Sequence, residues 1–161
     1  MNGTESPALA DHEFVRGMSP EDVELLSGAA VRVSIPAGQR LFGEGATADK
    51  CWLITAGHVA LDLHRQPGQP NLIVETVGRG DVLGFSWLAP PHRWQFGAQT
   101  VEPTTAFELD GPDVMALCDG HPELGYQFAL RMLAAAVRRL QATRIRLLDL
   151  YGVPGQEAEA R

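Results

Sequence analysis

The sequence predicts a mainly β protein with flanking helices, in which a compact antiparallel barrel or roll precedes a long C-terminal helix. Short apolar stretches recur at near-regular spacing up to residue 109, with glycine at the reversals between them. These stretches do not alternate with helical patterns, so βαβ units are not expected. After residue 110 the apolar period changes from two residues to that of a helix.

The composition indicates a single soluble domain. The chain has 161 residues, of which 45% are hydrophobic and 20% charged, and its formal net charge is −7. This acidic balance argues against broad binding to nucleic acids or anionic membranes. Cys51 and Cys118 are far apart and belong to no metal-ligand motif, so reduced thiols, no metal and a cytoplasmic location are expected. We find no signal peptide and no membrane-spanning segment in the sequence.

The N-terminal part contains one helix start. Residues 1–17 combine glycine, proline, serine and acidic residues without periodicity, which predicts a flexible arm. Ser19 can cap a helix that begins at Pro20, because a hydroxyl at the N-cap and a proline at the first position are both favourable. Gly28 is expected to end this helix.

The central part is predicted to form the roll, within a ligand-sensing region of residues 18–120. Period-2 alternation and apolar runs predict strands at residues 31–35, 41–42, 51–54, 59–63, 72–77, 98–101 and 105–109. Turns rich in glycine and proline separate them. Residues 80–102 form an aromatic segment between strands and helices, and four large aromatic side chains lie within it: Phe85, Trp87, Trp94 and Phe96.

Two helices are expected after the roll. Asp110 or Asp113 can start a short helix that ends near Cys118, and a long helix is expected over residues 121–151, followed by a flexible tail at 152–161. A heptad seam runs along the long helix at Tyr126, Leu130, Leu133, Val137, Leu140, Arg144, Leu147 and Tyr151. Such a narrow stripe is typical of a two-helix coiled coil, so we expect a homodimer.

An alternative is that the stripe packs on the barrel of the same chain, since Phe128, Ala129, Ile145 and Leu148 offer a second apolar face. Arg144 is the exception within the seam. A cation there lowers stability and is normally tolerated for register or for a ligand.

Several spaced motifs resemble a known domain. They are Pro36-Ala37-Gly38, Leu41-Phe42, Glu44-Gly45, Trp52-Leu53-Ile54, Gly57-x-Val59 and Gly80-Asp81-Val82-Leu83-Gly84. Together they resemble the cyclic nucleotide-binding domain, the effector domain of the bacterial catabolite activator and fumarate-nitrate regulator superfamily, over residues 14–151. The resemblance implies a jelly-roll-like β-roll with flanking helices and a parallel dimer formed by the long helix. Residues 138–143 resemble the part of that helix which reaches the base of bound cyclic AMP.

The phosphate-binding cassette departs from the family pattern. Gly84 is kept, but Phe85 stands where the family has a glutamate that accepts from the ribose hydroxyl. The position of the family's phosphate-binding arginine falls near Trp94 or Gln95, and Arg93 lies one or two residues early. Ser86 can cap a short helix through Leu88 whose free N–H groups attract an anion.

Three interpretations follow. In the first, the roll binds a cyclic nucleotide resembling cyclic AMP, or another small anionic ligand, in a regulatory (sensor) protein. The candidate ligand-binding residues are Gly84, Phe85, Ser86, Trp87, Arg93, Trp94, Gln95, Thr143 and Arg144. In the second, aromatic side chains fill the pocket and the protein is a dimeric interaction module. The third, an enzyme, is disfavoured because the histidines are scattered and no nucleophile motif is present.

Only ten residues follow Tyr151, too few for a helix-turn-helix. We therefore expect a stand-alone effector domain that does not bind DNA as this chain alone and that has a protein partner in a regulatory pathway. The oxygen and haem sensors of the family that the chain resembles use extra cysteines or a haem-ligating histidine. This sequence has no N-terminal cysteine cluster, so neither metal nor haem is expected.

Overall fold

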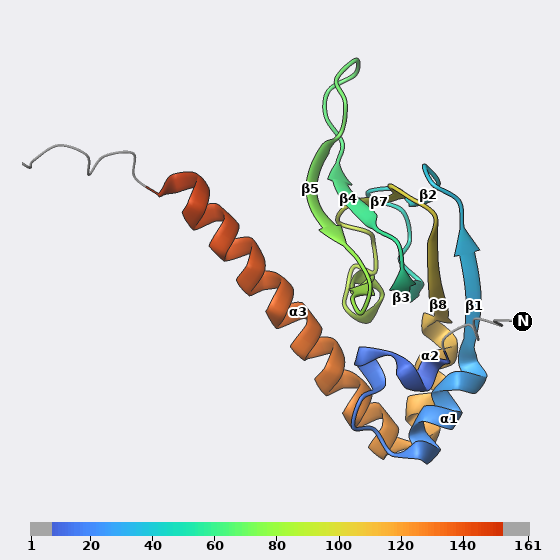
Figure 1. The fold of residues 1–161 in the computed structure, drawn as a ribbon. Helices are drawn as coiled ribbons and strands as arrows, with labels where there is room; N and C mark the ends of the chain where they lie inside the picture. Colours follow the sequence, from blue (N-terminus) through green and yellow to red (C-terminus); the bar gives the residue numbers. More distant parts are fainter. Residues whose placement is uncertain (1–7, 153–161) are drawn as a thin grey trace, which may run out of the picture.

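The β-strands form two four-stranded antiparallel sheets in the computed structural model, which describes residues 8–152 (Figure 1). The first sheet has the order β1 (Ala30–Ile35), β8 (Thr104–Asp110), β3 (Lys50–Ala56) and β6 (Val82–Leu83). The second has the order β2 (Arg40–Phe42), β7 (Gly97–Thr100), β4 (Val59–Leu63) and β5 (Leu72–Val77). The expected β-roll with flanking helices is therefore confirmed.

Most predicted strands differ from the observed ones by only one or two residues at their ends. Strand β6 was expected only as part of a motif, because two residues are too few to show a period. Along β3 the side chains alternate: Leu53 lies opposite Phe107 of β8, and Trp52 lies opposite Glu108. Trp52 contacts Phe42 of the other sheet, with ring centroids 5.7 Å apart, so this side of β3 lies inside the roll.

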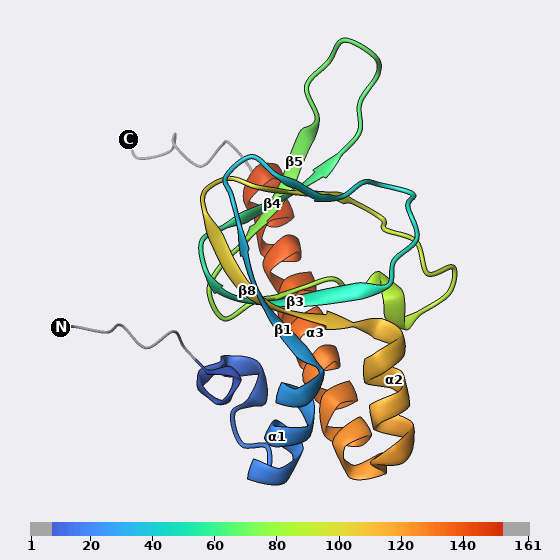
Figure 2. The same ribbon diagram turned by 90° about the vertical axis from the view of Figure 1, so that its right-hand side faces the viewer.

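Helices α1 (Pro20–Ala29) and α2 (Gly111–Gly120) lie together at one end of the roll (Figure 2). Both begin as the sequence predicts. The Ser19 hydroxyl accepts a hydrogen bond from the backbone N–H of Asp22 at 3.1 Å, and the Asp110 carboxylate accepts one from the N–H of Asp113 at 3.1 Å. These contacts satisfy N–H groups that have no partner within the helix.

Residues 1–17 were expected to form a flexible arm, but the structure describes residues 8–17 of this segment as folded. Residues 8–17 contain two short 3-10 turns, η1 (Leu9–Asp11) and η2 (Glu13–Val15). Leu9, Phe14 and Val15 are buried, and the Phe14 ring meets Phe128 at 5.3 Å. Turns of three residues are too short for an apolar period, which explains why the sequence pattern missed them. Residues 1–7 and 153–161, including most of the expected tail, lie outside the described part.

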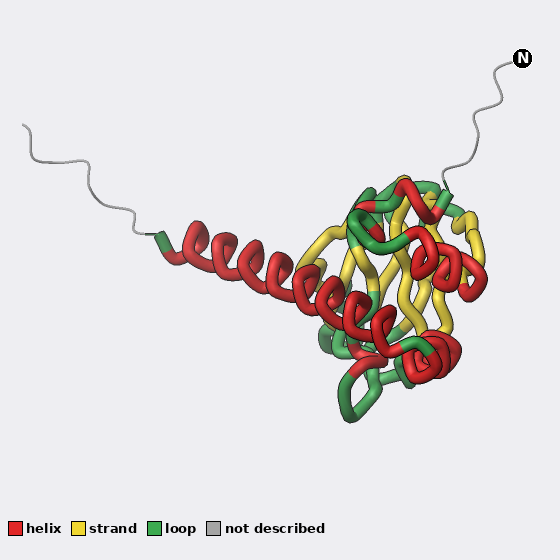
Figure 3. The backbone as a smooth tube through the Cα atoms, turned by 90° about the horizontal axis from the view of Figure 1, so that it is seen from below, coloured by secondary structure: helices red, strands yellow, loops and turns green. Residues whose placement is uncertain are grey.

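Helix α3 (Pro122–Tyr151) has two different sides. Leu124, Phe128, Met132 and Ala135 are buried against the rest of the chain, whereas every residue from 140 to 151 is exposed. The C-terminal half of the helix extends away from the roll (Figures 1 and 3). Between residues 8 and 152 no helix has the length and apolar character needed to span a membrane.

The heptad seam does not pack on the roll. Tyr126 is 64% exposed, Leu133 60% and Leu140 51%. At 100° per residue the seam lies about 150° around the helix from the buried side. The alternative in which the stripe covers its own barrel is therefore wrong. Of the proposed second face only Phe128 is buried, while Ala129, Ile145 and Leu148 are exposed.

Candidate functional site

The predicted ligand residues centre on the β6–β7 loop, which we define as residues 84–96. The loop joins β6, an edge strand of one sheet, to β7 of the other, so it passes between the two sheets. Backbone hydrogen bonds hold it against the segment between β2 and β3. Trp94 donates its N–H to Ala46 at 2.9 Å and accepts from Gly45 at 2.8 Å, and Ala48 donates to the His92 carbonyl at 2.8 Å. These hydrogen bonds fix the second half of the loop against residues 45–48.

Gly84 occupies a position where a side chain does not fit. Its φ is +101°, which side chains rarely adopt, and an added Cβ would lie 2.8 Å from the Lys50 carbonyl oxygen and 3.1 Å from Trp94. The local backbone geometry therefore explains why a glycine stands at position 84. It allows both the turn after β6 and the close approach of the Trp94 ring.

Trp94 fills the interior of the roll next to Gly84. Its side chain is 5% exposed, and its ring stacks on Phe42 with centroids 3.7 Å apart and planes inclined by 13°. Trp52 lies on the other sheet with its centroid 6.2 Å from that of Trp94. The aromatic group of Trp94 thus lies between the two sheets.

Arg93 and Gln95 lie on the opposite side of the same segment. Both are exposed, and the Arg93 guanidinium donates to the Gly45 carbonyl at 3.0 Å. In an extended segment successive side chains point to opposite sides, so placing Trp94 inside directs its two neighbours outward. The structure does not bring Arg93 into the roll interior.

The first part of the loop faces helix α3. The expected short helix is present as a 3-10 turn, η3 (Ser86–Leu88), but Ser86 does not cap it: Phe85 stands at the N-cap position and makes no side-chain capping hydrogen bond. Trp87 is buried: its indole N–H donates to the Gly84 carbonyl at 3.2 Å, and its ring lies 6.2 Å from that of Phe128 on α3. Gly111 of α2 makes room for this indole, since an added Cβ would meet it at 2.8 Å.

Phe85 lies beneath a cation of α3. The Arg139 guanidinium carbon is 4.8 Å from the centroid of the Phe85 ring, within the range of a cation–π interaction. The same guanidinium pairs with Glu75 of β5, with 3.2 Å between Nε and the carboxylate oxygen, and donates to the carbonyl of Val82 on β6. Arg139 therefore links α3 to two strands and to the loop. We call this set of contacts the Arg139 clasp.

The clasp is largely removed from water. The side chains of Arg139 and Glu75 are 19% and 17% exposed. Burial raises the pKa of the Glu75 carboxyl above its usual value, although Arg139 and Arg146 oppose this effect. Burial also lowers the pKa of Arg139, while Glu75 and Asp81 oppose the shift. Arginine still remains charged at neutral pH.

Thr143 and Arg144 are not brought to the loop. Both are exposed, and the Thr143 hydroxyl donates to the carbonyl of Arg139, one turn earlier on the helix, at 3.0 Å. Thr143 lies on the same side of the helix as Arg139, and Arg144 lies on the side of the exposed seam. Their predicted ligand roles remain predictions.

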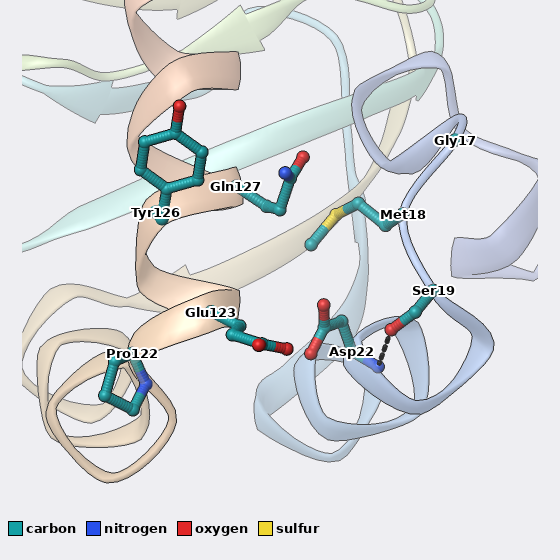
Figure 4. Close-up of a pocket in the computed structure, with 8 residues that line it drawn as sticks. All are labelled: Gly17, Met18, Ser19, Asp22, Pro122, Glu123, Tyr126 and Gln127. Atoms are coloured by element: carbon teal, nitrogen blue, oxygen red, sulfur yellow. Dashed lines mark hydrogen bonds between the residues drawn. The ribbon is translucent and has the colours of Figure 1, made fainter.

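Two surface cavities lie near α3. One, of about 280 Å³, borders the clasp between β5 and α3, and Glu75, Asp81, Arg138, Arg139 and Arg146 line it together with smaller residues. The other, of about 520 Å³, lies beside the start of α3 (Figure 4). Its charged lining groups are the carboxylates of Asp22 and Glu123, which do not suit an anionic ligand. Within residues 8–152, no three His, Cys, Asp or Glu side chains gather closely enough to hold a metal ion.

The site residues predicted from the sequence do not include Phe42, Glu75 or Arg139. For Arg139 a signal was present, because it continues the helical spacing of Leu124, Phe128, Met132 and Ala135 on the buried side. No comparable local signal marks Glu75, since its partner is 64 positions away in the chain.

Comparisons with known proteins agree with this fold. Residues 32–121 match the family model of the cyclic nucleotide-binding domain. The chain is 29% identical over 153 residues to a CRP-like cAMP-activated global transcriptional regulator of Mycobacterium tuberculosis. The aligned part covers 94% of this chain and 66% of that protein. The chain thus spans slightly less than two thirds of this relative.

Solved structures give the same result. The catabolite activator protein of Thermus thermophilus is 26% identical, with a TM-score of 0.67 over 87% of this chain and 63% of that one. A cyclic nucleotide-binding domain from Methylobacillus flagellatus is 22% identical, with a TM-score of 0.73 over 87% of this chain and 77% of that one. The second likeness concerns the fold alone.

Proposed function

The chain belongs to the cyclic nucleotide-binding domain family, and from this we propose that it is a regulatory domain whose roll senses a small ligand and whose helix α3 transmits the signal as part of a homodimer. By their descriptions, the Mycobacterium tuberculosis relative is a transcriptional regulator and the Thermus thermophilus protein is a catabolite activator. Ligand sensing and dimer signalling by this chain are our proposal.

The exposed seam of α3 is the observation that carries the proposal. Leu130, Leu133, Val137, Leu140 and Leu147 are each at least 42% exposed, although the opposite side of the helix is buried in the core. Burying a large apolar side chain contributes about 1.5–3 kcal/mol. A second copy of the helix is the partner that fits the seam best, because its apolar residues recur at the same heptad positions.

The Arg139 clasp supports communication between loop and helix. Any ligand that displaces Phe85, or that competes with Glu75 for the guanidinium, alters contacts that hold α3 on the roll. A difference in these contacts between two states is what allows a ligand to shift an equilibrium. The clasp is therefore the proposed link between the β6–β7 loop and the dimer helix.

The ligand we propose is a small anionic molecule of the cyclic nucleotide class, bound weakly. The Mycobacterium tuberculosis relative is cAMP-activated by its description, and a protein of similar fold, the regulatory domain of Toxoplasma gondii PKA, has been solved with cAMP. In this chain Phe85 cannot accept a hydrogen bond from a ribose hydroxyl, and Arg93 is directed outward. Two such losses correspond to roughly two decades in affinity or more.

A second candidate function is a dimeric interaction module that no longer binds a nucleotide. The stack of Trp94 on Phe42 favours it, because this stack occupies space between the sheets. In this case α3 would still form the dimer, and the signal would come from a protein partner.

Sedimentation equilibrium tests the dimer. The wild-type protein at tens of micromolar is expected to be a dimer, and Leu133→Asp combined with Leu140→Asp should give folded monomers. Ile145→Asp is the matched control, because Ile145 is 60% exposed on the same helix but lies off the seam. A wild-type monomer, or an equal effect of the control, would contradict the proposal.

A further inference from the structure

Residues 8–17, which we call the N-terminal strap, lie between helix α3 and the end of β3. Phe14 of the strap packs on Phe128 of α3 with ring centroids 5.3 Å apart. The Arg131 guanidinium of α3 donates to the backbone carbonyl of Arg16 at 2.8 Å. On its other side the strap contacts the roll. It is therefore a second connection between α3 and the roll, separate from the Arg139 clasp.

His12 joins the strap to the roll and is buried, with 7% of its surface exposed. Its ring lies between two backbone groups: Nδ1 accepts from the N–H of Phe14 at 3.0 Å, and Nε2 donates to the carbonyl of Ile54 at 2.9 Å. Only the neutral ring can make both contacts, because an imidazolium carries a hydrogen on each nitrogen. A second proton would place a hydrogen of Nδ1 against the N–H of Phe14.

Ile54 also holds the backbone of the turn that precedes β6. Its carbonyl accepts from the N–H of Gly80 at 2.9 Å, and its own N–H donates to the carbonyl of Asp81 at 3.0 Å. The strap packs directly on this turn, since an added Cβ at Gly80 would lie 3.2 Å from Cγ of Glu13. The contact of His12 with Ile54 therefore lies close to the segment that leads into the β6–β7 loop.

Two surface cavities border the strap, and His12 lines both. One, of about 470 Å³, is shared with α1, and the other, of about 650 Å³, is shared with β3 and the turn before β6. Burial lowers the pKa of His12, whereas its hydrogen bond to Ile54 and the charges of Glu13 and Asp81 oppose this shift. The charged groups near the ring come from the strap, from that turn and from α1: Asp11, Glu13, Arg16, Arg79, Asp81 and Glu24.

We propose that His12 is a proton-sensitive latch, which holds the strap on the roll while the ring is neutral and releases it when the ring takes up a second proton. Release leaves the strap attached to α3 alone, so α3 loses its connection to the end of β3. A histidine whose pKa is lowered in the folded state holds fully at higher pH, and its hold weakens as pH falls below about 6.5. This response to acid goes beyond ligand sensing, because neither the β6–β7 loop nor the seam takes part in it.

Thiol labelling of the full chain with Val15→Cys and Cys118→Ser tests the latch. Val15 is a strap residue with 2% exposure, so the introduced thiol reacts only when the strap opens. The native Cys51 of β3, which is fully buried, reports larger openings. Labelling by a dipyridyl disulfide, which reacts in acid, is compared with that of the urea-unfolded protein at the same pH. The introduced thiol should be less protected than Cys51 at pH 7.5 and at pH 5, because local opening costs less than global unfolding.

Protection of the introduced thiol should fall roughly tenfold from pH 7.5 to pH 5. The ceiling is about thirtyfold, because pH 5 lies about 1.5 units below the ordinary pKa of a freed histidine. His12→Gln, which cannot take up a proton, should remove this dependence whether its strap is open or closed. His64→Gln is the control and should keep it, because His64 is an exposed histidine of the β4–β5 hairpin.

The proposal is overturned if the introduced thiol is as protected as Cys51, if its protection does not fall in acid, or if His12→Gln keeps the fall. Should Val15→Cys not fold, hydrogen exchange of the wild-type Phe14 amide, corrected for its intrinsic rate, gives the same comparison with the Ile54 amide. The dimer and ligand measurements are made at neutral pH, so a failure here leaves the proposed function intact.

Discussion

Replacing Arg139 by methionine would break the clasp at its centre while keeping the helix propensity of the site, because arginine and methionine are nearly equal in this respect. The variant leaves Glu75, 17% exposed, without its cation and removes the donor to the Val82 carbonyl. Breaking a fully buried pair costs about 3–5 kcal/mol. Since one fifth of the Arg139 side chain is exposed, we expect about 2–3 kcal/mol, or a fall of roughly 5–10 °C in melting temperature.

The loss should depend on pH and on Glu75. Burial already raises the pKa of the Glu75 carboxyl, and removing Arg139 removes a charge that lowers it. An acid whose pKa is raised in the folded state costs stability when ionised, so the cost begins to fall below that pKa and is gone near the lower pKa of the unfolded chain. The free energy of unfolding of Arg139→Met should therefore approach that of wild type on acidification, and Glu75→Gln should recover much of the loss at pH 7.

Urea denaturation at fixed protein concentration measures these differences. Arg138→Met is the control, because Arg138 is an exposed neighbour on the same helix, and it should stay within about 0.5 kcal/mol of wild type. A loss in Arg139→Met no larger than in this control would refute the reasoning. So would a loss that Glu75→Gln does not reduce, since the penalty is assigned to the unpaired carboxylate.

Three further predictions concern other sites. Arg144→Leu should raise the melting temperature in ligand-free buffer, because two copies of this cation face each other across the proposed seam; a fall of several degrees would reveal a structural partner. Acidification below pH 6.5 should lower the free energy of unfolding, because burial lowers the pKa of His12. The neutral ring accepts a hydrogen bond from the Phe14 N–H and donates one to the Ile54 carbonyl. Urea titrations at pH 7.5 and 5 check this, and His12→Gln should weaken the dependence. Calorimetric titration should give cyclic AMP a dissociation constant in the high micromolar range or weaker; a submicromolar value would show a rebuilt site.

Much of the fold could be predicted because its signals are local. Strand alternation, the Ser19 cap and the helical period after Pro122 depend on neighbours within a few residues, and each was found in the structure. The two sides of α3 were both visible as apolar stripes. Which stripe packs on the roll could not be read from them, because that choice depends on complementarity with Phe14 and Trp87, distant in the chain.

The candidate site was harder to predict for the same physical reason. Gly84 and the aromatic content of the loop were evident, but whether Arg93 or Trp94 lies inside depends on the register of the loop against residues 45–48. A shift of one residue reverses the direction of every side chain in an extended segment. The partners of Arg139 come from β5 and β6, so the clasp exists only once the chain has folded.

Oxidative cross-linking at the seam tests most directly whether α3 is a parallel dimer helix. A disulfide requires Cα atoms within about 4.4–6.8 Å, a distance that facing seam positions of a parallel coiled coil satisfy. Leu140→Cys, which replaces a 51% exposed side chain, should therefore form a covalent dimer under mild oxidation. Thr143→Cys, exposed on the roll-facing side of the same helix, should stay monomeric on a denaturing gel. Failure of Leu140→Cys to cross-link, or equal cross-linking of Thr143→Cys, would contradict the account.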